Sequence, residues 1–306
     1  MKYGPKPRTF ILFIKVICKR MKKCRWSEFL KSKACAFCHT AASQGLAVWL
    51  AMAVLVSAGL QEEEALGKPR SSYGLGSAGY LKETNLLYSL YVDTPESQWT
   101  DTDKEQTLYS LLLAADYIEE QAVEYGCETQ LICDWQENPE LTGNATVDFA
   151  ISDEEDFVDR LDEEIALWVK EKVDFSGLKK SCNAKGIALL VFVNNPGTSY
   201  AIVFDGVDNP KESLILFREE PPSVYAHEIL HLFGAHDLYR DAEYTKEVTD
   251  FVGAAYPLEI MFTVADETGV TYTDKIVNEV SPITAYHLGW INDAEEIELF
   301  PQLKRK

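Results

Sequence analysis

The chain has 306 residues, a length that predicts one sizeable domain with additional segments or two small domains. Its composition, 46% hydrophobic and 11% aromatic, excludes an intrinsically disordered protein. The net charge of −20 is unevenly divided, because residues 1–44 carry +10 and residues 61–306 carry −30. So acidic a region argues against nucleic acid or anionic lipid as a partner.

The basic segment 1–44 contains four cysteines, Cys18, Cys24, Cys35 and Cys38. The order Cys35-x-x-Cys38-His39 matches an attachment site for c-type haem, and a small zinc site that includes Cys24 is a second alternative. The apolar run at 45–60 predicts that this segment lies on the cytoplasmic side of the membrane, where haem attachment would not occur. The cysteine spacing also differs from that of a zinc ribbon, which has two CxxC pairs. We interpret the four residues as reduced cysteines.

Residues 45–60 form an uncharged, apolar run after the basic segment. These sixteen residues are fewer than the ~20 that span a bilayer comfortably, although membrane thinning accommodates shorter runs. The basic flank predicts a cytoplasmic N-terminal side and export of the remainder. We interpret the run as a transmembrane signal-anchor in the cell membrane, with an extracellular domain after it. The alternatives are a signal peptide cleaved near Ala58, which gives a secreted protein, and a buried core helix.

Residues 61–84 are charged and then rich in glycine and serine, as expected of a linker before a domain at 85–306. The run Ile187–Val193 is continuously apolar, which is typical of a strand buried on both faces. Strands are predicted at 85–92, 129–135, 187–193, 199–204 and 213–217, and helices at 101–125, 153–173 and 281–290. The alternation of these elements predicts the α/β class, as an α/β/α sandwich.

Three further predictions concern a helix cap, a loop-rich stretch and the cysteines of this domain. Thr100 or Thr102 is expected to cap the helix at 101–125. The stretch 239–278 has little hydrophobic periodicity and is expected to form loops. Three cysteines, Cys127, Cys133 and Cys182, allow at most one disulfide, for which Cys127–Cys133 is the candidate.

The most informative stretch is His227-Glu228-Ile229-Leu230-His231, which has the pattern H-E-x-x-H. On a helix, side chains four residues apart share one face, so both imidazoles can bind one Zn²⁺ ion. Glu228 can then act as general base towards a water molecule that the ion activates. Pro221-Pro222 can precede such a helix, and Ser223 is a suitable N-cap. The alternative is a core helix with two hydrogen-bonded histidines, but the pattern is rare by chance in a chain with five histidines.

The third metal ligand is expected just after this helix. Gly234 can adopt the left-handed conformation that ends a helix and turns the chain sharply. The register H-E-x-x-H-x-x-G-x-x-D then places Asp237 at the metal, and a carboxylate oxygen is an acceptable zinc ligand. His236, one residue earlier, is the alternative third ligand. A glutamate on a later helix, Glu247 or Glu259, is a further alternative that no motif supports.

The chain resembles metzincin-type zinc metallopeptidases, especially bacterial secreted and cell-surface members of the immune-inhibitor-like and snapalysin-like groups. The resemblance rests on the H-E-x-x-H-x-x-G-x-x-D-L-Y run, on Glu259-Ile260-Met261 and on the stretch 281–290. It implies a mixed, mostly parallel sheet, a zinc helix, and a C-terminal helical subdomain. It also implies that Met261 lies on a tight turn beneath the zinc. The chain departs from the family in having Asp237 in place of a third histidine and no tyrosine two residues after Met261.

The sequence therefore predicts a zinc metalloprotease, an endopeptidase that cleaves a peptide or protein substrate outside the cytoplasmic membrane. His227, His231 and Asp237 are the predicted ligands of Zn²⁺, and Glu228 is the predicted catalytic base. The rival interpretation is an exported, zinc-stabilised binding or adhesion domain without catalytic turnover. In that case both Asp237 and His236 would close the coordination sphere.

Overall fold

The computed structural model describes residues 78–150, 155–203, 212–239 and 244–304. All described residues belong to one compact unit, which begins at residue 71. The basic segment 1–44 with its four cysteines, the apolar run 45–60 and most of the linker 61–84 lie outside the described residues.

The predicted signal-anchor and cell-membrane localisation are corrected by the helices that the structure describes. None of these helices is both long enough and apolar enough to cross a membrane. The longest, α4 (Asp101–Glu124), has 24 residues, but it carries many charged side chains and buries only part of its surface. A spanning helix instead needs about 20 predominantly apolar residues. The run 45–60, on which the prediction rested, is not among the described residues.

A six-stranded sheet forms the centre of the described unit. Its strands are β1 (Glu83–Asp93), β2 (Thr129–Ile132), β3 (Thr142–Thr146), β4 (Gly186–Val193), β5 (Tyr200–Ile202) and β6 (Ser213–Phe217). The order is β2-β1-β4-β6-β5, and β3 pairs with the second half of β1. Every pair is parallel except β5 with β6, which is antiparallel, so the sheet is mixed and mostly parallel.

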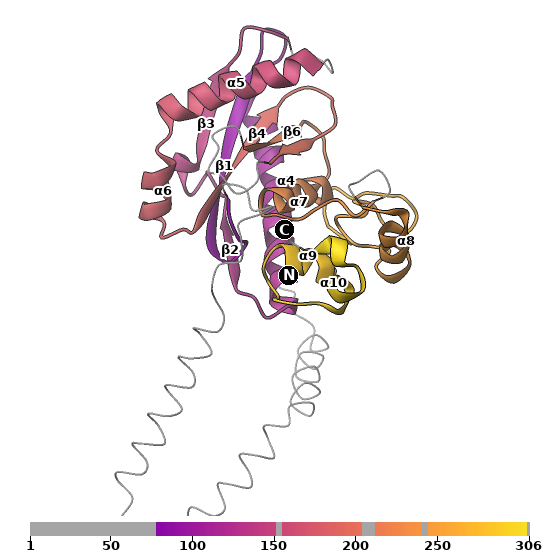
Figure 1. Ribbon diagram of the computed structural model, residues 1–306. Coiled ribbons are helices and arrows are strands. Elements are labelled where there is room, and N and C mark those ends of the chain that lie inside the picture. Colours follow the sequence, from indigo (N-terminus) through magenta and orange to yellow (C-terminus); the bar gives the residue numbers. More distant parts are fainter. Residues whose placement is uncertain (1–77, 151–154, 204–211, 240–243, 305–306) are drawn as a thin grey trace, which may run out of the picture. The chain divides into compact units, whose positions relative to one another are not determined.

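Helices cover both faces of this sheet. The helices after α4 are α5 (Glu155–Lys172), α6 (Phe175–Ser181), α7 (Pro222–Leu232), α8 (Lys246–Ala255), α9 (Pro282–His287) and α10 (Glu295–Leu299). Short 3-10 helices lie at Pro139–Leu141 and Pro301–Leu303. Figure 1 shows α5 on one side of the sheet, α4 and α7 on the other, and α8, α9 and α10 grouped together away from α5.

Alternate residues of the strands pack into two separate hydrophobic cores. On one face, Leu190 and Phe192 belong to a core shared with α4 and α7. On the other face, Leu189 and Val191 belong to a core shared with α5. All eight residues of β4 are buried, which confirms the strand predicted from its continuous apolar run. The predicted fold class, an α/β/α sandwich, is therefore confirmed.

The boundaries of the helices depend on local signals and on tertiary packing. Thr100 caps α4, because its hydroxyl accepts from the Asp103 amide while the Asp103 carboxylate accepts from the Thr100 amide. Helix α8 falls in the stretch where only loops were predicted. Its Val248 and Val252, four residues apart, are fully buried in the core next to α7, and Phe251 packs against the same core. These residues have helical spacing, but the helix is only ten residues long, and its packing in the core stabilises it.

The predicted Cys127–Cys133 disulfide is wrong, because Cys127, Cys133 and Cys182 are all free thiols. Burial raises the pKa of Cys133 to about 12, which keeps this thiol protonated and unreactive.

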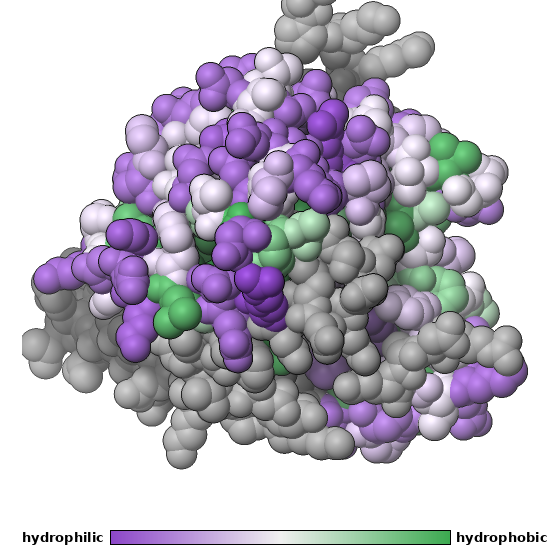
Figure 2. Space-filling view, turned by 90° about the horizontal axis from the view of Figure 1, so that it is seen from above, coloured by the Kyte–Doolittle hydropathy of each residue, from purple (hydrophilic) through white to green (hydrophobic). Residues whose placement is uncertain are grey.

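The surface seen from above is mostly hydrophilic, and hydrophobic residues appear there as small, separate patches (Figure 2). The large hydrophobic side chains that are exposed among the described residues come from several elements, including Tyr109 of α4, Leu167 of α5 and Leu299 of α10. Such scattered residues are ordinary for a folded domain and do not by themselves indicate a binding surface.

Candidate metal centre

Helix α7 supplies the three residues of the H-E-x-x-H pattern. It begins at Pro222, with Pro221 as the N-cap, so the predicted cap Ser223 lies inside the first turn. Proline is well suited to the first helical position, because its ring fixes a helical φ and its missing N–H is not needed there. One face of α7 packs into the sheet core through Ala226, Ile229 and Leu230, and this packing fixes the direction of the histidines.

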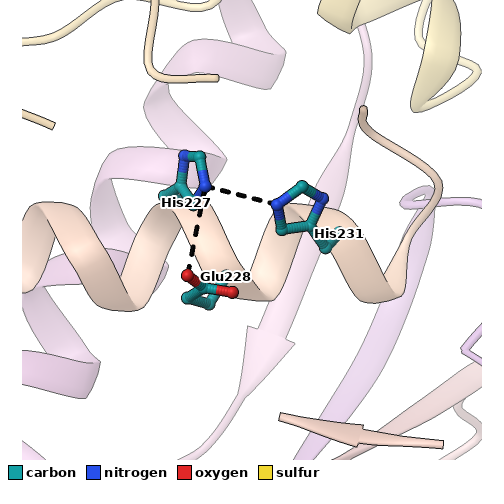
Figure 3. A group of neighbouring side chains, drawn as sticks. All are labelled: His227, Glu228 and His231. Carbon is teal, nitrogen blue, oxygen red and sulfur yellow. Dashed lines mark hydrogen bonds and ion pairs between the residues drawn. The ribbon is translucent and has the colours of Figure 1, made fainter. Parts of the chain in front are cut away.

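The two histidines converge, as their spacing predicts. The Nε2 atoms of His227 and His231 are 3.2 Å apart, and the rings stand perpendicular with centroids 4.8 Å apart (Figure 3). The Nδ1 atom of His227 lies 2.9 Å from the Ile260 carbonyl oxygen, and Nδ1 of His231 lies 2.9 Å from that of Ala235. A carbonyl oxygen can only accept, so each Nδ1 carries a hydrogen. When both rings are neutral, their Nε2 atoms therefore present lone pairs to each other.

Asp237 completes a triangle with these nitrogens. Gly234, at φ +96°, turns the chain after α7 and allows the following segment to return to the helix. Oδ1 of Asp237 then lies 3.3 Å from Nε2 of His227 and 3.2 Å from Nε2 of His231. This oxygen is buried and accepts no hydrogen bond from any described residue.

These three atoms fit a small divalent cation. Three acceptors in mutual contact repel one another unless a proton or a cation lies between them. An ion bound tetrahedrally at about 2.0–2.1 Å from each ligand separates the ligands by about 3.3–3.4 Å. The observed separations of 3.2, 3.2 and 3.3 Å agree with that geometry. Two imidazole nitrogens and one carboxylate oxygen are also a ligand set that metal ions such as zinc accept.

The pKa values of Asp237 and His231 are shifted by the close contact between the carboxylate and the imidazoles. Burial alone would raise the pKa of Asp237, but the adjacent imidazoles of His227 and His231 hold it well below its usual range. Burial would lower the pKa of His231, but the Asp237 carboxylate raises it above its ordinary value. The centre therefore stabilises the combination of a charged carboxylate with positive charge near the imidazoles.

Glu228 lies beside the triangle rather than within it. Its Oε1 is 4.0 Å from Nε2 of His227, a contact drawn as a dashed line in Figure 3. Glu228, His227 and His231 form a cluster whose ligand atoms lie within 4.8 Å of one another. Burial raises the pKa of Glu228, while the two histidines oppose that shift. A carboxylate in this position can accept a proton from a water molecule bound in front of the histidines.

The alternative ligands proposed from the sequence lie elsewhere. The ring of His236 packs against that of His287 in α9, with centroids 4.9 Å apart. Glu247 is exposed in the first turn of α8. Glu259 is fully buried and its carboxylate accepts hydrogen bonds from Ser281 and Thr284. Of the four candidates for the third ligand, Asp237 is the one that the structure brings to the histidines.

The structure adds neighbours of the ligands that the sequence pattern did not assign. The Tyr239 hydroxyl donates to Oδ2 of Asp237 at 2.9 Å, which leaves Oδ1 directed at the imidazoles. The turn 258–262, which contains Met261, contributes two carbonyl oxygens: that of Ile260 accepts from His227, and that of Met261 accepts from the Leu238 amide at 2.8 Å. Met261 itself is fully buried. The position of Tyr239 two residues after Asp237 could have indicated its role from the sequence. The two backbone carbonyls could not have been identified in this way, because any residue type supplies one.

A cavity of about 590 Å³ adjoins the N-terminal end of α7. Tyr225 of α7 and Thr107 of α4 contribute to its wall. The cavity is acidic, because five carboxylates and one guanidinium line it: Asp103, Glu105, Glu219, Glu220, Asp274 and Arg218. It adjoins the helix of the candidate centre without containing any of the three candidate ligands.

Comparison with known proteins gives little beyond a distant likeness. No family model matches the sequence, and no curated protein matches it. Among solved structures, the chain is similar to the crystal structure of metalloproteinase-II from Bacteroides fragilis, with 13% sequence identity and a TM-score of 0.38 over 74% of this chain. The chain covers 59% of the length of that protein. A likeness at this level carries no functional argument.

Proposed function

We propose that the protein is a zinc-dependent endopeptidase in which His227, His231 and Asp237 hold Zn²⁺ and Glu228 is the general base. The observation that carries the proposal is the triangle of two Nε2 atoms and one carboxylate oxygen with 3.2–3.3 Å sides, with a fourth side chain of raised pKa next to it. Zinc, when bound, supplies Lewis acidity that polarises a carbonyl group and lowers the pKa of a water molecule.

Each residue of the chain then has a separate task in peptide hydrolysis. The Ile260 and Ala235 carbonyls hold the imidazoles with Nε2 free to bind the metal, and Tyr239 holds Asp237. Glu228 accepts a proton from the water whose oxygen attacks the scissile carbonyl carbon. It then donates that proton to the leaving nitrogen as the carbon–nitrogen bond breaks. The burial of Glu228 supports both transfers, because a raised pKa makes the protonated form accessible.

The rival function, a zinc-stabilised binding domain without turnover, would be favoured by a coordination sphere closed by His236. The contact between His236 and His287 does not support that arrangement. Peptides or proteins are the substrates of the proposed peptidase.

The test combines metal analysis with peptide cleavage on the purified full-length chain. The wild-type protein is expected to bind one equivalent of zinc and to cleave members of a peptide library. Glu228→Gln is expected to keep the zinc and to lose cleavage by about 10²–10⁴-fold, the contribution typical of a general base. Glu247→Gln, a control at an exposed glutamate of α8, is expected to keep both. A fully active Glu228→Gln protein would refute the assignment of the base.

A further inference from the structure

Glu259 is a buried carboxylate that the proposed chemistry does not use. Its exposed fraction is 0%, and it lies in the turn 258–262 between α8 and α9. Moving a charged carboxylate out of water costs several kcal/mol unless hydrogen bonds compensate for it. A glutamate in such a position therefore needs a structural partner.

Three donors surround this carboxylate. Oε1 accepts from the Met261 amide at 3.2 Å and from the Thr284 hydroxyl at 2.8 Å, and Oε2 accepts from the Ser281 amide. Burial raises the pKa of Glu259, whereas these donors favour its charged form. Since all three of these groups are donors, the arrangement suits an ionised carboxylate, which can only accept.

These bonds join two segments that are about twenty residues apart in the chain. The backbone adds to the junction, because the Ile260 amide donates to the Glu279 carbonyl and the Glu279 amide donates to the Leu258 carbonyl, both at 2.9 Å. The turn 258–262 is thereby attached to the start of α9. Its position does not depend on any regular secondary structure of its own.

The two residues after Glu259 reach the candidate metal centre. The Ile260 carbonyl accepts from Nδ1 of His227, and the Met261 carbonyl accepts from the amide of Leu238, which follows Asp237 directly. The consecutive carbonyls of Ile260 and Met261 thus orient two candidate ligands, His227 directly and Asp237 through its neighbour Leu238. A shift of this turn would move both ligands relative to His231.

We infer that Glu259 is a positioning residue for the metal centre. Its carboxylate, held by Met261, Ser281 and Thr284, fixes the turn so that the Ile260 carbonyl keeps His227 in its Nδ1–H tautomer with Nε2 directed at the metal. The role in metal binding rests on the proposed function. The control of the His227 tautomer does not, because it can be measured in metal-free protein.

The isosteric variant Glu259→Gln tests the inference. Gln has the same shape but must place an amide NH₂ group against one of the donors, which breaks the arrangement of hydrogen bonds. In metal-free, ¹⁵N-histidine-labelled protein, two-bond ¹H–¹⁵N spectra distinguish the Nδ1–H and Nε2–H tautomers, and the His227 signals are those missing from His227→Ala. We expect the Nδ1–H tautomer in the wild type and a mixture in Glu259→Gln. We expect zinc affinity to fall by about 10–100-fold, as for other residues that orient ligands.

A matched control separates positioning from general destabilisation. Ile165→Ala creates a cavity in the core beneath α5, on the opposite face of the sheet from the metal centre, and is expected to leave the His227 tautomer and the zinc affinity unchanged. If Glu259→Gln fails to fold, Thr284→Val removes one donor and is expected to show the same changes to a smaller extent, while Thr284→Ser restores the wild-type values.

Equal effects of Glu259→Gln and Ile165→Ala, or a Glu259→Gln protein with the wild-type tautomer and zinc affinity, would overturn the inference. The inference would also be overturned if Thr284→Val and Thr284→Ser had the same His227 tautomer and the same zinc affinity. A wild-type protein that binds no zinc would refute the peptidase proposal. In that case a changed His227 tautomer in Glu259→Gln would still support the positioning of His227 by Glu259.

Discussion

Helix α7 and the turn 258–262 both determine the candidate metal centre, but by different physical means. The helix brings His227 and His231 together through its own backbone periodicity, so their proximity depends on residues four positions apart. The turn acts through backbone carbonyls whose position depends on hydrogen bonds that the Glu259 carboxylate accepts from Ser281 and Thr284, more than twenty residues later. Locally encoded geometry thus brings the ligands together, and long-range contacts decide how they are oriented.

The largest expected effect comes from removing a ligand that the helix supplies. His231→Ala leaves two ligands and no replacement from α7, and we expect zinc affinity to fall by more than about 100-fold, beyond the usual effect of an orienting residue. Cleavage should be lost with the metal. Zinc content after dialysis and peptide cleavage check this prediction. A variant that retains stoichiometric zinc and activity would remove His231 from the centre.

The next effect concerns the ligand that follows the helix. Asp237→Ala is expected to weaken zinc binding by about 100-fold or more, because Oδ1 lies 3.2–3.3 Å from both Nε2 atoms. His236→Ala, one residue earlier, should keep wild-type zinc content because its ring packs against His287. Isothermal titration with zinc compares the two variants. Retention in Asp237→Ala with loss in His236→Ala would reverse the assignment of the third ligand.

A smaller effect is expected from the hydroxyl group that orients Asp237. Tyr239→Phe removes the hydrogen bond to Oδ2, and we expect about a 10-fold loss of zinc affinity, at the low end for orienting residues. The loss is limited because Tyr239 is 39% exposed, so water can replace the hydroxyl. The variant Tyr109→Phe, at an exposed tyrosine of α4, serves as the control. Equal affinities of the two variants would contradict an orienting role for Tyr239.

The smallest effect concerns the stability of the metal-free protein. Burial raises the pKa of Glu228 in the folded protein above about 4.3, the ordinary pKa of a glutamate in the unfolded chain. Between these two pKa values the folded protein holds a proton that the unfolded chain has released. The free energy of unfolding therefore falls as the pH rises through this range. Glu228→Gln lacks this loss and should have the higher unfolding midpoint at neutral pH in the presence of a chelator. The difference should shrink as the solution is acidified through this range. Thermal unfolding at several pH values checks it, and a difference independent of pH would contradict it.

Several elements were predictable because their signals are local. The continuous apolar run of β4, the capping box at Thr100 and the H-E-x-x-H spacing of α7 each depend on neighbouring residues, and the structure contains each element. Helix α8 was missed although Val248, Phe251 and Val252 have helical spacing, because that pattern covers only ten residues and a helix so short is stabilised mainly by packing against the core. The Cys127–Cys133 disulfide was wrong because residue counting says nothing of how two thiols are placed.

The sequence by itself determined that the two imidazoles would meet on one face of their helix, because residues four apart in an α-helix lie one turn above each other. Only the tertiary structure decided that Oδ1 of Asp237 faces those imidazoles while His236 turns to His287, since adjacent residues after Gly234 point in different directions according to the path of the chain. It also decided the role of Glu259. A buried carboxylate acquires its partners from segments that meet only when the chain folds, and no local pattern encodes that meeting.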